Sequence, residues 1–310
     1  MFESKGKAPL HQRFVPILVF VPAALVLSFL AVTYKNPKTT STNGSFVFSL
    51  NNIRHGISSK FWAEDRSATV QKVWELAEAM TPEEAAKVNN EQLYSMFPET
   101  YNCDKNFFRR IGGEGDGGKW SCGEFFKPKE GNCVAISLGS NGQFEFEESI
   151  LAHTKNNCTI YTFDCTGTWT PPNPQIKFHP WCLGNDGVFN SRIYKSWESI
   201  TNDLGLTHVD FFKIDIEGFE WVAMPSVLEH WNLKVMPKQI SIEMHMWPQP
   251  EGVPEHYQTT TTPSGIDYLH SAINFFRAFY KAGYQVAAAE YNPLSTNHCC
   301  QEFTFVRSSE

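Results

Sequence analysis

The sequence predicts an α/β domain with a mainly parallel sheet, preceded by a single membrane-spanning helix. Three observations support this prediction. Short apolar runs alternate with amphipathic stretches from residue 132 onward, a glycine-rich turn follows the first of those runs, and an uncharged apolar run lies near the N-terminus. Strands that alternate with helices indicate βαβ units, whose sheets are mainly parallel and covered on both faces.

The N-terminal apolar run extends from Phe14 to Val32 without a charged residue. A helix needs about 20 apolar residues to cross a bilayer, so residues 14–33 are predicted to form a transmembrane signal anchor. The run is longer than the roughly 7–15 apolar residues of a cleaved signal, which favours an uncleaved anchor over the cleaved alternative. Basic residues lie on both sides of the run, so the charge rule only weakly favours a short cytoplasmic tail at residues 1–13.

The residues after the anchor carry the features of a lumenal domain. All eight cysteines follow the anchor, and an even number fits disulfides in an oxidising compartment, with free buried thiols as the alternative. Asn43 and Asn157 each begin an N-glycosylation pattern. We therefore expect a single-pass protein of the Golgi or another secretory-pathway membrane. The net charge of −7 argues against nucleic acid as a partner.

Two segments are predicted to separate the anchor from the main domain. The polar residues 34–60 read as a linker or stalk. Residues 61–131 are predicted to be a helical segment that packs on the core, because Val70, Trp74 and Ala77 fall on one helical face. Thr81-Pro82-Glu83-Glu84 has the pattern of a helix start.

Residues 132–310 are predicted to form the α/β domain. Its strands are expected at Cys133–Leu138, Thr159–Phe163, Ile176–Trp181, Val209–Ile214, Gln239–Glu243, Tyr284–Ala288 and Glu302–Val306. Helices are expected at Glu145–His153, Trp197–Leu204, Trp221–Trp231 and Ile266–Ala282. No helical stretch separates the last two strands, so we expect them to form an antiparallel hairpin at one edge of the sheet.

Ligands of open α/β sheets bind beyond the carboxyl ends of the strands. The first such end carries Gly139, Ser140, Asn141 and Gly142, where glycine lets the backbone turn sharply and approach a ligand. The next strand ends at Asp164, 22 positions after Gly142 (164 − 142). An acid at about that distance binds ribose hydroxyls in dinucleotide-binding folds, and an adenosyl ligand makes the same demand. A purely structural turn at either place is the competing interpretation.

Two further strand ends carry ionisable side chains. Asp215 and Glu217 follow an apolar strand and could orient a ligand amine, bind a cation or accept a substrate proton. Glu243 and His245 lie two positions apart and therefore share one face of an extended segment. His245 is a candidate general base or metal ligand, although a single histidine more often satisfies a local hydrogen bond.

The motif Lys213-Ile214-Asp215-Ile216-Glu217-Gly218-Phe219-Glu220, together with Val134–Gly142 and Asp164, resembles the FkbM-type methyltransferases. The chain resembles more closely a methyltransferase-like domain family of animals, whose members often carry an N-terminal anchor. That similarity rests on Arg109–Gly113, Asp116–Cys122 and Glu243–His245. It implies a Rossmann-like seven-stranded methyltransferase sheet that binds S-adenosylmethionine. Many methyltransferases have an acid where this chain has Ser137.

By this resemblance Gly139, Gly142 and Asp164 match the cofactor-binding positions, and Asp215 matches the acid near the methyl donor. The expected reaction is methylation of an oxygen, with a glycan hydroxyl or another lumenal acceptor as substrate and Asp215, Glu243 and His245 as catalytic candidates. The same three side chains could also hold a divalent cation, because this ligand set suits several divalent ions. The alternatives are a Golgi-type glycosyltransferase, for which Asp215-Ile216-Glu217 approximates a D-x-D pair, and a non-catalytic binding domain.

Overall fold

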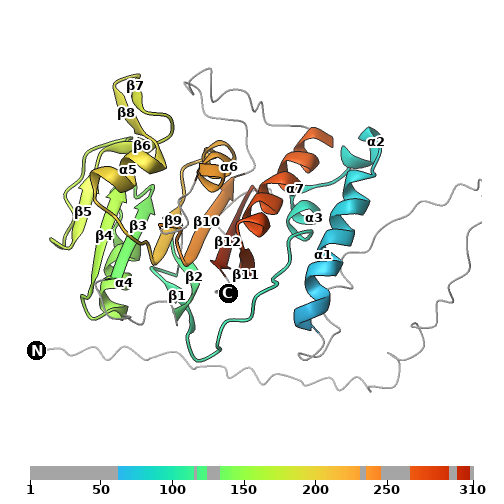
Figure 1. Ribbon diagram of the computed structural model, residues 1–310, viewed down its shortest axis with the longest axis horizontal. Coiled ribbons are helices and arrows are strands. Elements are labelled where there is room, and N and C mark those ends of the chain that lie inside the picture. Colours follow the sequence, from blue (N-terminus) through green and yellow to red (C-terminus); the bar gives the residue numbers. More distant parts are fainter. Residues whose placement is uncertain are drawn as a thin grey trace, which may run out of the picture. The chain divides into compact units, whose positions relative to one another are not determined.

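The computed structural model describes residues 62–114, 117–123, 133–230, 235–245, 266–292 and 299–307 (Figure 1). All of them fall within one unit, Ser49–Glu310. The predicted cytoplasmic tail, anchor and stalk lie outside these residues. Among the residues that are described, no helix has both the length and the apolarity needed to span a bilayer.

A seven-stranded sheet forms the centre of the domain, with the order β11-β12-β10-β9-β3-β4-β5. Its strands are β3 (Cys133–Leu138), β4 (Cys158–Phe163), β5 (Ile176–His179), β9 (Phe211–Ile214), β10 (Gln239–His245), β11 (Tyr284–Tyr291) and β12 (Cys300–Arg307). The neighbouring strands β10, β9, β3, β4 and β5 pair in parallel. β12 lies between β10 and β11 and runs antiparallel to both. The mixed α/β fold and the antiparallel edge hairpin are thus confirmed, and each strand coincides with a predicted one.

Two smaller sheets were not predicted. The segment 61–131, expected to be helical, contains the antiparallel pair β1 (Phe108–Ile111) and β2 (Lys119–Cys122). The second sheet contains β6 (Trp181–Leu183), β7 (Gly187–Phe189) and β8 (Arg192–Lys195). The predicted strand Ile176–Trp181 is wrong at its end, because Pro180 separates β5 from β6. Proline has no N–H group to continue the ladder of hydrogen bonds.

The helices follow the predicted pattern closely. They are α1 (Trp62–Glu78), α2 (Pro82–Ala85), α3 (Asn90–Tyr94), α4 (Glu145–His153), α5 (Trp197–Asp203), α6 (Glu220–His230) and α7 (Ile266–Lys281). Thr81 and Glu84 form the predicted capping box at the start of α2. α1 packs on the domain as expected, since Val70 and Trp74 are buried and the Trp74 indole lies against Tyr280 of α7.

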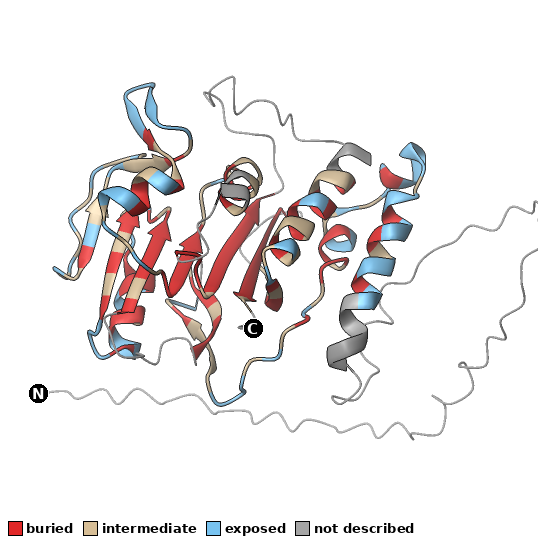
Figure 2. Cartoon of the chain, in the orientation of Figure 1, coloured by how far each residue is buried: buried red, intermediate tan, exposed pale blue. Residues whose placement is uncertain are grey.

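One face of the central sheet, here called the apolar face, is mainly hydrophobic along β3, β9, β10 and β12. Its side chains form one cluster with residues of α1, α5, α6 and α7. The residues of the apolar face are Ile136, Leu138, Phe212, Ile214, Ile240, Ile242, Met244, Phe303 and Phe305. Phe305 stacks on Phe279 of α7 with ring centroids 4.0 Å apart. Alternation along each strand places these side chains on one face of the sheet, and Figure 2 shows that the central strands are buried along most of their length.

The opposite face, here called the polar face, carries polar and charged side chains at the alternate positions of the same strands. A continuous line across the sheet, here called the polar row, consists of Thr162, Ser137, Lys213, Ser241 and Thr304, joined by register. All five are buried. α4 covers the β3–β4 part of this face and β2 covers the β10–β12 part. The short β1–β2 pair thus takes the place of a helix over half of the sheet.

Four disulfides link the eight cysteines, and no described cysteine is free. The pairs are Cys103–Cys122, Cys133–Cys158, Cys165–Cys182 and Cys299–Cys300. The first attaches β2 to the segment before β1, and the second joins β3 to β4. The prediction of disulfides is confirmed, and the alternative of free thiols is wrong.

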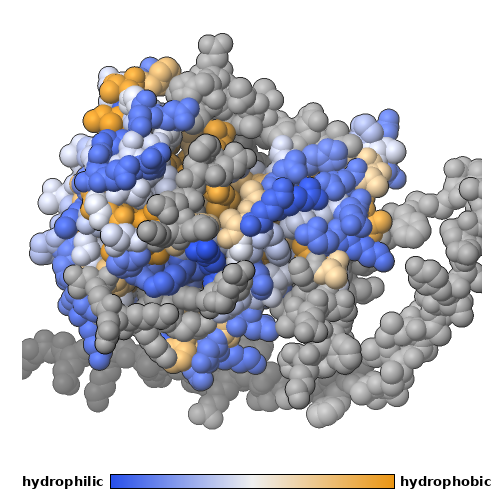
Figure 3. All heavy atoms as spheres, viewed as in Figure 1, coloured by the Kyte–Doolittle hydropathy of each residue, from blue (hydrophilic) through white to orange (hydrophobic). Residues whose placement is uncertain are grey.

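The hairpin of β7 and β8 projects from the domain, at the upper left of Figure 1. It exposes Val188, Phe189 and Ile193, which are 75%, 37% and 40% accessible. Figure 3 shows hydrophobic side chains gathered at this place. Arg192 and Tyr194 of the same hairpin line the large pocket described below, so the apolar tip stands beside the pocket.

Candidate functional site

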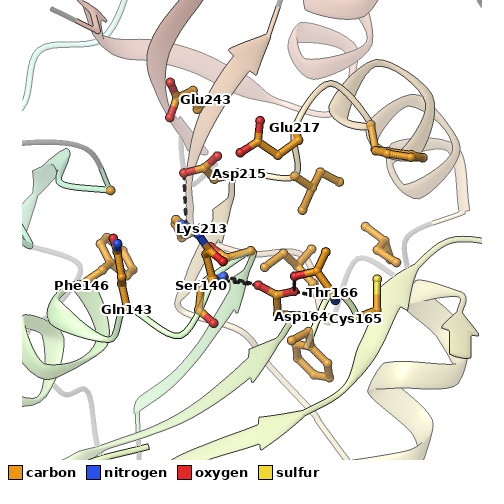
Figure 4. A pocket seen from close by; sticks show the side chains of 18 of the residues that line it. Ser140, Gln143, Phe146, Asp164, Cys165, Thr166, Lys213, Asp215, Glu217 and Glu243 are labelled. Carbon is orange, nitrogen blue, oxygen red and sulfur yellow. Dashed lines mark hydrogen bonds and ion pairs between the residues drawn. The ribbon is translucent and has the colours of Figure 1, made fainter. Parts of the chain in front are cut away.

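A pocket of about 1030 Å³ lies at the carboxyl ends of β3, β4, β9 and β10. This is the edge at which ligands of open α/β sheets bind. In Figure 4, Asp215, Glu217 and Glu243 lie on one side of the pocket, whereas Ser140, Asp164 and Thr166 lie on another. The structure therefore brings together all four strand ends that the sequence singled out.

The loop after β3 approaches the neighbouring backbone so closely that it requires glycine. Gly139 has φ of +77°, and a Cβ added there would lie 1.6 Å from the carbonyl oxygen of Asp215. Gly142 has φ of +75°, and its added Cβ would lie 2.5 Å from the Trp169 ring. Asn141 between them also has a positive φ, of 47°. Gly139, Ser140 and Asn141 line the pocket, so the backbone of this loop lies close to it, as a ligand-binding loop requires.

Asp164 holds this loop in place. One of its carboxylate oxygens accepts hydrogen bonds from the backbone N–H groups of Ser140 and Asn141, at 3.0 and 2.7 Å. The other accepts from the backbone N–H and the hydroxyl of Thr166, at 2.9 and 2.7 Å (Figure 4). Four hydrogen bonds occupy the acceptor positions of a carboxylate. A ribose hydroxyl that binds Asp164 must therefore replace one of these donors.

Asp215 lies between cationic side chains at the end of β9. Its carboxylate is 3.4 Å from the Lys213 ammonium, 3.5 Å from the Lys119 ammonium and 3.9 Å from His245 Nε2. Burial alone would raise the pKa of Asp215, but these three cations outweigh it and hold the pKa below its usual range. Asp215 is therefore an anion at neutral pH and a weak proton acceptor.

Lys119 of β2 is 1% exposed and provides a positive charge to the polar face. Its ammonium donates a hydrogen bond to Glu302 and lies 3.4 Å from the Glu243 carboxylate. Burial lowers the pKa of Lys119, but the carboxylates of Glu302, Asp215 and Glu243 outweigh burial and raise it. The other Glu243 oxygen accepts a hydrogen bond from the Asn292 amide at 2.8 Å. Glu243 is thereby fixed by two partners.

His245 is buried at the end of β10 and is oriented by Glu220. Its Nδ1 lies 3.1 Å from the Glu220 carboxylate, which also accepts from the backbone N–H groups of Ile216 and Gly218. Burial lowers the pKa of His245, but Glu220, Asp215 and Glu243 raise it to about 9. The ring is therefore an imidazolium at neutral pH, that is, a cation and not the neutral imidazole that a general base needs, the role for which the sequence made His245 one candidate.

Glu217 is the most accessible carboxylate of this group, since its side chain is 69% exposed. It stands at φ of +59° in the turn between β9 and α6, and its Oε2 lies 3.8 Å from His245 Nε2. Partial burial raises the pKa of Glu217, and the nearby His245 lowers it, but Asp215, Glu220 and Glu243 raise it again, so that the pKa stays above its usual value. A carboxylate with a raised pKa at the pocket surface is suited to accept a proton.

The side chains do not fit a divalent cation in this arrangement. Asp215, Glu220 and His245 come within 4.8 Å of one another, as do Glu243, His245 and Cys300. Glu220 is, however, already bonded to two backbone amides, and Cys300 is in a disulfide. The Lys119 ammonium contacts both Asp215 and Glu243. We therefore assign no metal to the cluster.

Sequence reasoning missed Lys119, Glu220 and Glu302 as parts of the site. Lys119 follows two glycines in the segment 61–131, which was predicted to be helical and to pack on the core. Glu220 belongs to the motif that carries the family resemblance, but no role in the site was predicted for it. The signal that could have indicated Glu302 is its place in the last apolar run, where a charged residue needs a buried partner.

Comparison with known proteins shows what the chain is similar to. A family model described as "Methyltransferase domain" matches residues 54–307. No curated protein matches the chain. A candidate hemolysin from Streptococcus thermophilus is 10% identical, with a TM-score of 0.35 over 59% of this chain and 62% of that chain, which is less than two thirds of its length.

Two other solved structures show similarly remote likeness. A Methanococcus jannaschii fibrillarin pre-rRNA processing protein is 10% identical, with a TM-score of 0.34 over 60% of this chain and 69% of that chain. TrmK of M. capricolum, in complex with S-adenosylhomocysteine, is 9% identical, with a TM-score of 0.33 over 60% of this chain and 67% of that chain.

Proposed function

The chain belongs to the family of methyltransferase domains, and we propose that it transfers a methyl group from S-adenosylmethionine to an acceptor oxygen. The observation that carries this proposal is the glycine loop, which Asp164 holds open beside a pocket of about 1030 Å³. Glycosyl transfer is less well supported, because the Asp215 carboxylate contacts two lysines rather than having room for a metal and a nucleotide sugar.

The residues fit the cofactor at the pocket. We assign the backbone of Gly139, Ser140, Asn141 and Gly142 to its binding, with Asp164 at the ribose and Asp215 on the side of the methyl donor. A bound S-adenosylmethionine would supply an electrophilic methyl group. The remaining requirement is to align an acceptor oxygen with that group and to remove the acceptor's proton.

We assign the protein's part in the reaction to the acidic side of the pocket. Glu217 accepts the acceptor's proton, since its carboxylate is exposed and its pKa is raised. His245, held by Glu220, stays charged and positions Asp215 and Glu217. Glu243 keeps Lys119 beside Asp215. This division of roles replaces the base role that the sequence suggested for His245 or Asp215.

The acceptor we propose is a hydroxyl group of the secretory pathway, such as that of a glycan. Four disulfides support an oxidising compartment. Asn157 of the second glycosylation pattern is exposed, whereas Asn43 lies outside the described residues. A single-pass anchor at residues 14–33, with the domain in the lumen of the Golgi or a related membrane, remains part of the proposal, as does kinship with FkbM-type and animal methyltransferase-like proteins.

Titration calorimetry of the full-length, oxidised chain tests this proposal. We expect S-adenosylmethionine to bind and UDP- and GDP-sugars not to bind. Gly139→Ala should abolish binding, because the added methyl group would overlap the Asp215 carbonyl. Gly205→Ala is the matched control, since Gly205 also has a positive φ but no atom lies near its added Cβ. Preference for a nucleotide sugar would establish glycosyl transfer instead, and binding of none of these ligands would leave a non-catalytic domain.

A further inference from the structure

The disulfide Cys299–Cys300 differs from the other three in what it connects. Its two cysteines are consecutive residues, whereas the cysteines of the other pairs are 17 to 25 positions apart. A disulfide stabilises a fold mainly by closing a loop of the unfolded chain, and the stabilisation grows with the length of that loop. A bond between neighbouring residues closes almost no loop. Cys299–Cys300 therefore contributes little to the stability of the fold.

The same adjacency makes this disulfide easier to reduce. The peptide bond between consecutive residues holds their Cα atoms 3.8 Å apart, whereas the Cα atoms of most disulfides are about 4.4–6.8 Å apart. A pair that cannot reach the usual separation is more readily reduced. Cys165–Cys182, which also lines the pocket, has a Cα separation of 5.0 Å and joins the end of β4 to β6. The two disulfides of the pocket should therefore differ in their resistance to reduction.

A small molecule in the pocket can reach the Cys299–Cys300 bond. Both cysteines line the pocket, and they are 9% and 3% exposed. Their backbone is fixed on both sides, since the Tyr94 hydroxyl donates a hydrogen bond to the Cys299 carbonyl at 3.1 Å and Cys300 pairs with His245 across β12 and β10. Opening of the S–S bond would therefore leave both sulfur atoms beside the pocket.

The sulfur atom of Cys300 lies among the charged groups of the acidic side of the pocket. Cys300 Sγ, a carboxylate oxygen of Glu243 and a ring nitrogen of His245 lie within 4.8 Å of one another. Glu243 is already paired with Lys119, whereas the His245 imidazolium offers a positive charge to a thiolate. A nearby cation lowers the pKa of a cysteine thiol, and a thiol of lower pKa leaves a disulfide faster. Cys300 is therefore the sulfur suited to leave.

We propose that Cys299–Cys300 is a redox-active disulfide, which a dithiol reductant opens from the pocket while the other three disulfides stay closed. A thiolate of the reductant attacks Cys299 Sγ, the S–S bond breaks, and its electron pair passes to Cys300 Sγ beside His245. The second thiol of the reductant then attacks the mixed disulfide and releases Cys299. The reductant leaves as a cyclic disulfide, and the two cysteines take up its two electrons and two thiol protons.

Timed reduction of the full-length, oxidised chain with dithiothreitol tests the proposal. Free thiols are blocked with iodoacetamide at successive times and located by mass spectrometry of the peptides. We expect Cys299–Cys300 to open at least about tenfold faster than Cys165–Cys182, although the cysteines of the second pair are more exposed. If Cys165–Cys182 opened first or at an equal rate, accessibility alone would decide the order and the proposal would be wrong.

A variant tests the part played by His245. His245→Asn removes the cation beside Cys300, so we expect this disulfide to open about threefold to tenfold more slowly, with no change for the other disulfide of the pocket. His208→Asn is the control, since His208 is exposed and lies outside the pocket, and it should change neither rate. An unchanged rate in His245→Asn would contradict the role of His245 as the cation that assists Cys300. None of these measurements uses S-adenosylmethionine, so their outcome is independent of the proposed methyl transfer.

Discussion

The two faces of the central sheet are formed by the same strands, but one carries mainly hydrophobic side chains and the other carries many polar and charged ones. The apolar face packs phenylalanine, isoleucine and methionine beneath α5–α7 and α1. The opposite face buries Lys119, Lys213, Glu243 and Glu302 beneath α4 and β2. Buried charges contribute little net stability, because desolvation offsets their attraction. The difference indicates that the apolar face stabilises the fold, whereas the polar face positions charges at the pocket.

We expect the largest effect from removal of Lys119, the central cation of the polar face. Lys119→Met leaves Asp215, Glu243 and Glu302 without their shared partner, and we expect a loss of about 5 kcal/mol in the free energy of unfolding. Urea denaturation at neutral pH measures it. Adding Glu302→Gln should recover part of the loss, because one buried carboxylate is then neutral.

Lys281→Met serves as the control for that experiment, since Lys281 is exposed at the end of α7. Its effect should stay within about 0.5 kcal/mol. A similar small effect for Lys119→Met would mean that the carboxylates of the polar face do not depend on this lysine.

The apolar face should respond to the loss of volume rather than of charge. Phe305→Ala removes a fully buried ring that stacks on Phe279, and we expect a loss of about 4 kcal/mol. The loss should be independent of pH between 6 and 9, unlike effects on the polar face. Thr304→Ser, one residue away on the opposite face, keeps the hydroxyl group and should cost less than about 1.5 kcal/mol. Equal losses at the two positions would contradict the division of the sheet.

The smallest expected effect is the pH-dependent stabilisation by His245 on the polar face. The pKa of His245 is raised to about 9 in the folded protein, against about 6.5 in an unfolded chain. Its stabilisation is therefore complete below about pH 6.5 and is lost as the pH rises through 9, by at most about 3 kcal/mol. Urea denaturation at several pH values should show this loss in the unmodified chain and not in His245→Asn. The same loss in both proteins would place the titrating group elsewhere.

The sequence predicted most of the sheet, because the strands of the apolar face alternate or run continuously in hydrophobic residues. Cys133–Leu138 and Glu145–His153 were predicted to the residue. The β1–β2 pair escaped prediction because its strands are only four residues long and glycines precede Lys119. The pairing of cysteines follows from the folded topology and not from their spacing.

The sequence predicted which loops form the candidate site, but not the protonation states of its side chains. Gly139, Asp164 and Asp215 meet at one edge, as parallel strands require. That His245 is a cation depends on Glu220, which reaches it from the start of α6. Such contacts between distant segments set protonation states, and hydrophobic periodicity carries no information about them.

The disulfides set a condition on any search for activity. Cys103–Cys122 attaches the strand that carries Lys119, and Cys165–Cys182 joins the residue after Asp164 to β6. Thiols remain reduced in an ordinary bacterial cytosol, so protein expressed there would lack both attachments. An inactive preparation from such a host would report on its oxidation state and not on the chemistry of the pocket. Secretion from a eukaryotic host is therefore the appropriate route to material for assay.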